Sequence, residues 1–340
     1  MTWTRHSGLL AAFLLALLLM LLPACGKKQE GFVKVTRASL YTLASMTVVT
    51  NDEPKAQQAI ESAYKELEHL GQLLNFYADD SEVSEINRNA GVRPVKVSPE
   101  TFEVIEKAVF TSEMTEGAFD ITVGPLVKLW NFKKGVIPEK DAIAETLKRV
   151  GYRNIVLDKS AATVYLKNSG SQIDLGGILK GYAADKASQI LQKHGFLSGI
   201  VTVGGEVRAF GRKPDGGSWV VGIQNPRQKG QADEILATIS VSDKSLSTSG
   251  DYIRFFEKDG VRYHHLLNPR TGYPAEQCGS VTVMANDGIT ADGFAKIFVL
   301  GSEKGLAIAK KVGFDALFID CTGKITMSEG LQTQVRLQKP

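Results

Sequence analysis

Apolar side chains recur at intervals of three and four residues along much of this chain, a spacing that predicts amphipathic helices with one buried face. One such pattern runs from Pro54 to Leu74. A second helix is expected from Ser98 and Pro99, because serine caps a helix and proline suits its first position. Further helices are expected over residues 139–149, 181–194, 290–300 and 303–312. At 290–300, Thr290 is the expected N-cap, with Asp292 in the first turn.

Shorter apolar stretches bounded by turn residues predict strands. They lie at residues 155–158, 162–166, 200–203, 219–224, 235–241, 281–285 and 316–319. Several of them follow one another as pairs joined by a turn, such as the turn at 158–160, which indicates antiparallel hairpins. Because strands and helices do not alternate regularly, the predicted fold class is α+β, with antiparallel sheets flanked by helices.

The first 24 residues have the layout of a signal peptide. Arg5 and His6 precede an apolar run over residues 9–22. This run of 14 residues is short for a membrane span, which needs about 20. The segment Leu22–Cys25 resembles a bacterial lipoprotein box, in which the cysteine is acylated and becomes the first residue of the mature chain. The alternative is ordinary cleavage, which would leave Cys25 unmodified.

The expected organisation follows from this beginning. A signal peptide (1–24) precedes a lipid-anchored tether (25–38), a folded domain (39–331) and a C-terminal tail (332–340). Acyl chains on Cys25, palmitate among them, would supply about 0.8 kcal/mol of membrane affinity per buried methylene group. We therefore expect an exported protein that is held on a bacterial membrane, at its periplasmic face.

Composition and charge narrow the class of function. The chain has 40 basic and 37 acidic residues, and its formal net charge of +3 gives no reason to expect nucleic-acid binding. Three cysteines, Cys25, Cys278 and Cys321, are too few for a disulfide-built scaffold, and no metal-ligand spacing surrounds them. Cys278 and Cys321 are either disulfide partners or small core residues.

Five segments carry polar residues and glycines that apolar periodicity and turns do not require. They cover residues 116–126, 173–182, 203–208, 245–252 with 263–272, and 287–296. In the second segment a strand passes through a glycine pair into a helix, where backbone groups can approach an anionic ligand closely. This segment matches neither the phosphate loop G-x-x-x-x-G-K-[ST] nor the dinucleotide motif G-x-G-x-x-G.

Each of these segments also has a purely structural interpretation. Asp120 is able to cap the turn that follows it, and Asp292 to complement a helix dipole. The glycine pair at 204–205 is explained by a bulge as well as by a ligand. His264 and His265 are adjacent on an extended segment, so at most one of the two side chains faces a given site.

Taken together, the five segments resemble the FAD:protein FMN transferase family, also called the ApbE family. The matching blocks are Gly117–Leu126, Asp174–Gly177 with Lys180–Tyr182, Ser247–Tyr252, His265 with Pro269–Gly272, and Thr290–Asp292. The resemblance extends from about residue 40 to residue 328. It implies an α+β fold related to the tunnelling-fold proteins, FAD as substrate, and a divalent cation, usually Mg²⁺. It also implies transfer of FMN from FAD to a Thr or Ser hydroxyl of an acceptor redox protein, with release of AMP.

The resemblance also implies roles for particular residues. The flavin nucleotide is expected to contact Ser45, Tyr77, Ala118, Phe119, Asp120, Asp174, Lys180 and His265. The metal is expected at the backbone carbonyl of Gly177 and the carboxylate of Asp292. Cleavage of a diphosphate spreads negative charge over phosphoryl oxygens, which a cation and Lys180 would stabilise. His265 is the first candidate to accept the proton of the attacking hydroxyl, and Asp292 is the second.

The chain departs from the family pattern at two places. Where the family usually has Met-Gly-Thr before its first strand, this chain has Leu43–Ser45, or alternatively Met46-Thr47, and Ser45 keeps a hydroxyl group. Four residues after Asp292, where the family commonly has a metal-binding Thr preceded by Asp, this chain has Ala295 and Lys296. The Lys296 ammonium either replaces one cation, or points to solvent or pairs with Asp292 without a catalytic role.

Three functions are therefore open on the sequence. The first is a membrane-tethered flavin transferase. The second uses the same residues with water in place of the hydroxyl, as an FAD pyrophosphatase that yields FMN and AMP. The third is a lipoprotein that binds flavin without turnover. Solute-binding lipoproteins usually have two lobes with regular strand and helix alternation, which this sequence lacks.

Overall fold

The computed structural model describes residues 31–132, 134–227, 234–277 and 279–338. Its centre is an eight-stranded sheet in the order β1-β2-β6-β7-β10-β13-β14-β15, with every neighbouring pair antiparallel. The strands are β1 (Phe32–Ser39), β2 (Thr42–Val49), β6 (Gly199–Val203), β7 (Glu206–Phe210), β10 (Ser245–Gly250), β13 (Ser280–Ala285), β14 (Asp315–Ile319) and β15 (Ile325–Met327).

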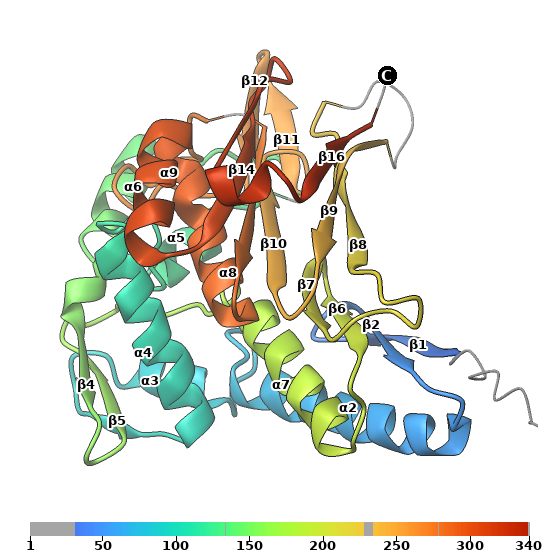
Figure 1. Cartoon of the computed structure of the whole chain (residues 1–340). Helices are drawn as coiled ribbons and strands as arrows, with labels where there is room; N and C mark the ends of the chain where they lie inside the picture. The colour runs from blue at the N-terminus through green and yellow to red at the C-terminus, as the bar shows by residue number, and fades with distance from the viewer. Residues whose placement is uncertain (1–30, 133, 228–233, 278, 339–340) are drawn as a thin grey trace, which may run out of the picture.

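Helices cover one face of this sheet (Figure 1). They are α2 (Glu53–Leu73), α7 (Leu179–Lys193), α8 (Gly288–Phe294), the 3₁₀ helix η2 (Ala295–Leu300) and α9 (Gly301–Val312). Outside them lie α3 (Glu82–Arg88), α4 (Pro99–Met114), α5 (Gly124–Leu129), α6 (Lys140–Leu147) and the 3₁₀ helix η1 (Tyr152–Asn154). A further 3₁₀ helix, η3 (Glu329–Leu331), contacts β14. Helix α7 packs between α2 and α8, so it lies at the centre of the helical layer.

A smaller sheet covers the opposite face. It consists of β8 (Trp219–Gln224), β9 (Ile235–Val241) and β16 (Val335–Leu337). Strand β13 shows how the core is divided: Val281 and Val283 belong to the apolar cluster under the helices, whereas Met284 belongs to the cluster under the smaller sheet. Because side chains alternate along a strand, all six residues of β13 are buried between two layers.

Two further sheets lie outside this core. One joins β3 (Val95–Lys96), β5 (Thr163–Leu166) and β4 (Ile155–Asp158), and the other pairs β11 (Phe255–Lys258) with β12 (Val261–His264). The hairpin of β4 and β5 is one that the sequence predicts. The expected α+β class, with antiparallel sheets flanked by helices, is confirmed.

The helix signals in the sequence have visible physical causes. Asp52 caps α2 by accepting a hydrogen bond from the backbone amide of Lys55, and Ala59, Ile60 and Ala63 on its inner face are fully buried. The Ser98 hydroxyl accepts from the amide of Thr101 at 3.2 Å, so the expected start of α4 is confirmed. In both helices the cap satisfies an amide that has no partner inside the helix.

The expected helix at 290–300 is wrong in its start and its continuity. Asp287, not Thr290, is the N-cap, and its carboxylate accepts from the Thr290 amide at 2.8 Å. The helix therefore starts at Gly288, and at Ala295 it narrows from α-helical to 3₁₀ geometry. As a result Asp292 is not in the first turn but further along α8, where its side chain faces α7.

The expected tether and tail are shorter than the sequence suggests. Residues 32–38, placed in the tether, form β1, in which Val33 pairs with Val48. Residues 335–337, placed in the tail, form β16 at the edge of β9. Both are edge strands with charged side chains such as Lys34 and Arg336, a composition that protects an exposed edge but also resembles a linker.

Some expectations fall on residues that the structure does not describe. The signal peptide and Cys25 lie outside the described residues, as does Cys278. Cys321 is disulfide-bonded. Within the described part of the chain, no helix combines the length and the apolar character that a membrane crossing requires.

Candidate functional site

Helices α7 and α8 touch at two glycines. A Cβ atom on Gly181 would lie 2.0 Å from the carbonyl oxygen of Gly288, and one on Gly288 would lie 2.3 Å from the carbonyl oxygen of Gly181. Asp185 strengthens the contact, because its carboxylate accepts at 2.7 Å from the Gly288 amide, one of the unpaired amides at the start of α8. The contact brings Lys180 at the start of α7 next to Asp292 in α8.

Two lysines and two carboxylates form a charged cluster there. The Asp292 Oδ1 atom accepts from Lys296 Nζ at 2.7 Å, and Oδ2 accepts from the Gly181 amide at 3.0 Å. Lys180 Nζ lies 3.7 Å from Oδ2 and donates to Glu206 Oε1 at 3.0 Å. The Asp292 side chain has no exposed surface, whereas the two lysine side chains keep 25% and 17%. The two lysine side chains are therefore more exposed than the carboxylate that they flank.

The two carboxyl groups of the cluster have pKa values shifted in opposite directions. Burial alone would raise the pKa of Asp292, but the ammonium groups of Lys180 and Lys296 outweigh it and lower that pKa to about 2. Burial and the nearby Asp292 raise the pKa of Glu206, and the lysines offset this only in part. Burial opposes the charge on Lys180, yet Asp292 and Glu206 raise its pKa above the ordinary value. At neutral pH Asp292 and Lys180 are thus ionised, and an added proton goes first to Glu206.

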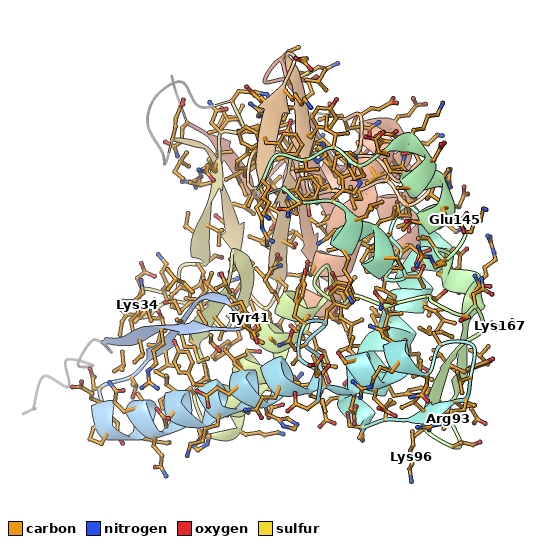
Figure 2. The ribbon with its side chains drawn as sticks, turned by 180° about the vertical axis from the view of Figure 1, so that it is seen from behind. Lys34, Tyr41, Arg93, Lys96, Glu145 and Lys167 are labelled. Atoms are coloured by element: carbon orange, nitrogen blue, oxygen red, sulfur yellow. The ribbon has the colours of Figure 1, made fainter. Side chains whose placement is uncertain are left out.

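Two hairpin turns flank the cluster. Leu40 and Tyr41 join β1 to β2 with left-handed backbone angles, φ 50° and 60°, and Tyr41 is 87% exposed (Figure 2). Gly204 begins the turn between β6 and β7, and a Cβ there would lie 2.9 Å from Thr42 Oγ1 and 3.0 Å from Lys180 Cδ. Positive φ at both central residues is the geometry that a two-residue hairpin turn requires. Thr42, at the end of this turn, and Gly204 therefore lie next to Lys180.

The segments around Phe119 and Gly177 lie side by side. The Asp174 amide donates to the Ile121 carbonyl at 2.7 Å, which joins the two segments. A Cβ on Gly177 would lie 3.2 Å from Phe119 Cε2 and 3.3 Å from Lys296 Cε. Gly177 therefore packs between the Phe119 ring and the Lys296 side chain, and its missing Cβ leaves room for both.

A second group of polar residues gathers around Arg254. Burial raises the pKa of Tyr77, and nearby Asp174 raises it further while Arg254 opposes. The Asp174 carboxylate accepts from the Gly176 amide at 2.8 Å. The pKa of Asp174 is raised overall. Burial raises it, and this hydrogen bond and Arg254 offset the rise only in part. Tyr77 is 73% exposed and lies near the Asp174 carboxyl group and the Arg254 guanidinium group.

The two histidines lie as their alternation predicts. His264 is buried, its Nε2 atom lies 2.9 Å from the Ala275 carbonyl oxygen, and its ring packs edge-on against Phe298. His265, on the other face, is partly exposed, and its amide donates to the Arg254 carbonyl at 3.0 Å. His264 is thus structural, and His265 faces the group around Arg254.

Burial and positive charge make His265 a weak base in the free protein. Burial lowers the pKa of His265, and Arg254 and Lys296 lower it further, to about 3. The hairpin that carries this residue rests on stacked rings: Trp130 on Phe132 at 5.5 Å and Phe256 on Tyr263 at 5.2 Å. These stacks fix the hairpin's position. Because the pKa of His265 is about 3, its imidazole is neutral at physiological pH.

Three expected site residues lie outside these groups: Ser45, Asp120 and Ala118. The Ser45 hydroxyl accepts from Thr36 Oγ1 at 3.0 Å within the sheet, and Thr42 lies nearer to Lys180. The Asp120 carboxylate is buried and accepts from the Thr122 amide, the Thr122 hydroxyl and one further backbone amide, so it holds its own turn. Their contacts with a flavin nucleotide, and that of Ala118, which is buried in an apolar cluster, stay predictions.

The remaining expected residues converge. Lys180, Asp292, Lys296, Gly177 and Phe119 form one end of the site, and Tyr77, Asp174 and His265 form the other. Sequence reasoning missed Glu206 and Arg254. Glu206 follows the glycine pair at 204–205, which was a usable signal, whereas nothing around Arg254 marks it.

The expected metal does not fit the donors present. Within the described ranges, no group of three His, Cys, Asp or Glu side chains could hold a metal ion. Of the two expected ligands, Asp292 already accepts from the ammonium group of Lys296, which also packs beside Gly177. A Mg²⁺ ion requires near-octahedral oxygen coordination, and a bound ammonium group opposes it.

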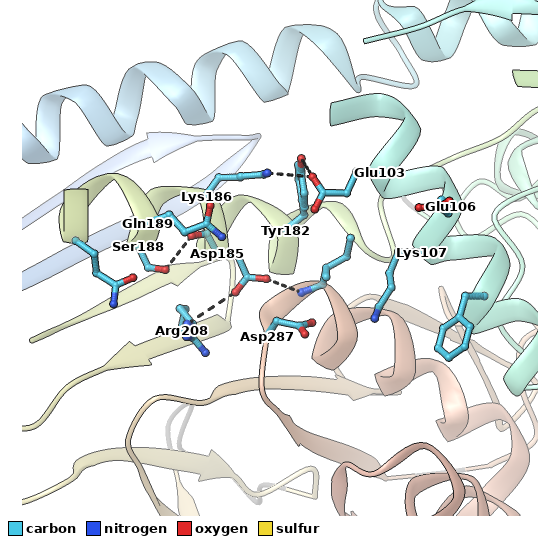
Figure 3. Close-up of a pocket in the computed structure, with 13 residues that line it drawn as sticks. Glu103, Glu106, Lys107, Tyr182, Asp185, Lys186, Ser188, Gln189, Arg208 and Asp287 are labelled. Atoms are coloured by element: carbon cyan, nitrogen blue, oxygen red, sulfur yellow. Dashed lines mark hydrogen bonds and ion pairs between the residues drawn. The ribbon is translucent and has the colours of Figure 1, made fainter. Parts of the chain in front are cut away.

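A separate cavity of about 560 Å³ lies on another side of α7 (Figure 3). It is lined by parts of α4, α7 and β7 and by the start of α8, and by none of the expected site residues. Glu103 there accepts from the Tyr182 hydroxyl at 2.7 Å and from Lys186 Nζ at 3.0 Å, and Asp185 faces Arg208. Four of its seven charged side chains are paired with one another.

Comparison with known proteins agrees with this geometry. The model of the ApbE family matches residues 40–318. The FAD:protein FMN transferase of Treponema pallidum is 38% identical over 297 residues, 82% of this chain and 82% of that protein. That of Haemophilus influenzae is 34% identical over 272 residues, 77% of this chain and 78% of that protein. The crystal structure of the ApbE protein from Thermotoga maritima has a TM-score of 0.82 at 33% identity, and covers 90% of this chain and 100% of its own.

The helix contact makes a first prediction. Gly288→Ala should lower the free energy of unfolding by about 1–3 kcal/mol, because the added methyl group collides with the backbone of Gly181 and separates α7 from α8. Ligand binding at the charged cluster should be lost with it. Urea denaturation and flavin fluorescence titration measure the two effects.

Gly293→Ala, on the same helix as Gly288, is the matched control. A Cβ at Gly293 would meet only side-chain atoms, at 3.2 Å or more. We expect it to cost much less and to retain binding. Equal losses in the two variants would show that the contact between Gly181 and Gly288 is not what positions the cluster.

Proposed function

This chain belongs to the ApbE family, and we propose that its site transfers the FMN half of FAD to a Thr or Ser hydroxyl of an acceptor protein. The observation that carries the proposal is the meeting of four of the five sequence blocks at one place, through Phe119, Lys180, His265 and Asp292. Lys180, Asp292 and Lys296 form its cationic end, and Tyr77, Asp174 and His265 form its other end. The first end suits a diphosphate, and the exposed ring of Tyr77 suits an isoalloxazine.

The reaction exchanges one phosphorus–oxygen bond for another. The acceptor hydroxyl oxygen forms a bond to the phosphorus of the FMN half, and the bond from this phosphorus to the bridging oxygen breaks. AMP leaves with the electron pair, and the hydroxyl proton passes to a base. Lys180 and Lys296 face the place where the negative charge develops, so the ammonium groups stabilise the transition state electrostatically.

His265 is the better of the two candidate bases. Asp292 has a pKa of about 2 and already accepts hydrogen bonds from Lys296 and Gly181, so it holds the cluster together instead of taking a proton. His265 is neutral and partly exposed. A bound diphosphate would counter Arg254 and Lys296, the two cations that depress the pKa of His265, and so raise its basicity when substrate is present.

Mg²⁺ is the cation that the resemblance implies, but we assign it no step. The oxygens expected to hold it, at Gly177 and Asp292, are beside the Lys296 ammonium. The relatives' names specify FAD, FMN and a protein acceptor.

Export and anchoring remain part of the proposal. A signal peptide over residues 1–24 and acylation of Cys25 would place the site near a membrane, at the periplasmic face. The support is the short apolar run and the lipoprotein-type segment Leu22–Cys25. An exported redox protein with an accessible Thr or Ser would then be the natural acceptor.

The proposed reaction leaves a covalent product that mass spectrometry detects. Coexpression with an exported redox protein should add one FMN, less water, to a Thr or Ser of that protein. The matched control is the acceptor with this residue replaced by Val or Ala. Free FMN and AMP with an unmodified acceptor would instead establish a pyrophosphatase, and unchanged FAD would establish a binding protein.

The role of His265 predicts a difference between the two histidines. His265→Ala should lower kcat by about 100-fold or more with little change in KM, because a proton acceptor acts in the transition state. His264→Ala should act mainly on stability, since its ring packs inside against Phe298. Steady-state kinetics and thermal melting of both variants separate these effects. A reversed order would rule His265 out as the base.

The pH profile gives an independent check on His265. Because its pKa is about 3 in the free protein, below the ordinary value of 6.5, the imidazole is neutral well below pH 6. We expect kcat/KM for FAD to stay level as pH falls from 8 to 5. A fall with an apparent pKa near 6.5 would show that Arg254 and Lys296 do not act on this ring as described.

Asp292 is expected to be indispensable for turnover but not for folding. Asp292→Asn keeps an acceptor for the Gly181 amide, yet it removes the negative charge that holds two ammonium groups. We expect the transfer rate to fall by about 100-fold or more, while circular dichroism still shows folded protein. Asp259→Asn, in an exposed turn, is the control. A rate within twofold of wild type would remove Asp292 from the reaction centre.

A further inference from the structure

We propose that Lys296 is a built-in cation that occupies the place of a protein-bound divalent metal, so that this site works without a metal held by Asp292. The inference rests on the proposed function and adds a catalytic residue to it. Lys296 lies between the two groups expected to bind metal: its Nζ is 2.7 Å from Asp292 Oδ1, and its Cε packs beside Gly177.

A second oxygen of Asp292 accepts from the same ammonium group. At Ala295 the chain changes from α8 to the 3₁₀ helix η2, and the Ala295 amide bonds to the carbonyl oxygens of Ala291 and Gly293. Lys296 Nζ donates to the carbonyl oxygen of Asp292 at 2.9 Å. One residue thus supplies two oxygens to one ammonium group.

The charges around Lys296 are balanced without a metal. Asp292 and Glu206 are the carboxyl groups of the cluster, and Lys180 and Lys296 are its ammonium groups. A divalent ion bound at Asp292 would have to displace Lys296 and would add repulsion with Lys180, 3.7 Å away from the same carboxylate. Removal of the Lys296 charge would lift the first penalty and leave the second.

The ammonium group is also suited to the reaction. The Lys296 side chain is 17% exposed, so its charge is shielded from bulk water yet reachable by a diphosphate. A fixed positive charge stabilises phosphoryl oxygens as a metal does, without directed coordination. A merely structural ion pair between Lys296 and Asp292 would also compete with a metal ion, but wild-type transfer would then be lost when metal is removed.

Electron paramagnetic resonance with Mn²⁺ as the probe tests the inference on the full chain, purified in detergent without FAD. We expect Lys296→Thr to bind Mn²⁺ at least tenfold more tightly than wild type, because it removes a competing cation and adds a hydroxyl. Lys296→Gln, close in length and uncharged, should shift affinity in the same direction and serves if the Thr variant does not fold. Lys310→Thr, on the exposed side of α9, is the matched control and should equal wild type.

FMN transfer in the presence of EDTA is the second readout. Wild type should keep at least half of its rate, whereas Lys296→Thr should lose at least tenfold and recover with Mn²⁺. Equal Mn²⁺ affinity in wild type and both Lys296 variants, or loss of wild-type transfer in EDTA, would overturn the inference. The expected difference in Mn²⁺ affinity without FMN transfer in any variant would support the inference and contradict the proposed function.

Discussion

The backbone contact between Gly181 and Gly288 is the constraint on which the site depends. A Cβ on either residue would collide with the carbonyl oxygen of the other, so α7 and α8 approach more closely than any other residue pair would permit. Asp185 caps α8 across the same contact. Only at this separation can Asp292 accept from the Gly181 amide while it lies beside Lys180. The packing of two helices thus decides where the charges of the site lie.

Those charges explain why a flavin dinucleotide is a suitable substrate. The buried carboxylate of Asp292 holds two ammonium groups whose side chains remain partly exposed, which presents positive charge to a diphosphate at little cost in reorganisation. Across the site, His265 and Tyr77 lie on irregular segments near Arg254. The rigid helices therefore carry the phosphate end, and loops and a hairpin carry the flavin end.

Much of this could be predicted from local sequence signals, and the failures have physical causes. Periodicity and caps are local, so α2 and the start of α4 were predictable. Strand β10 was missed because three of its buried positions are Ser245, Ser247 and Ser249, whose burial depends on β7 and β13 and not on apolar character. Lys180 and Asp292 belong to matching blocks, but their pairing with Glu206 and the position of Arg254 arise only from tertiary contacts.

A crystal structure of the protein with FAD and Mn²⁺ tests the central claim most directly, because anomalous scattering separates manganese from phosphorus. We predict that the diphosphate lies within hydrogen-bonding distance of Lys180 and Lys296, with Lys296 still paired with Asp292 and no anomalous peak at that carboxylate. A diphosphate bound away from both lysines, or a manganese ion on Asp292 with Lys296 displaced, would contradict the account.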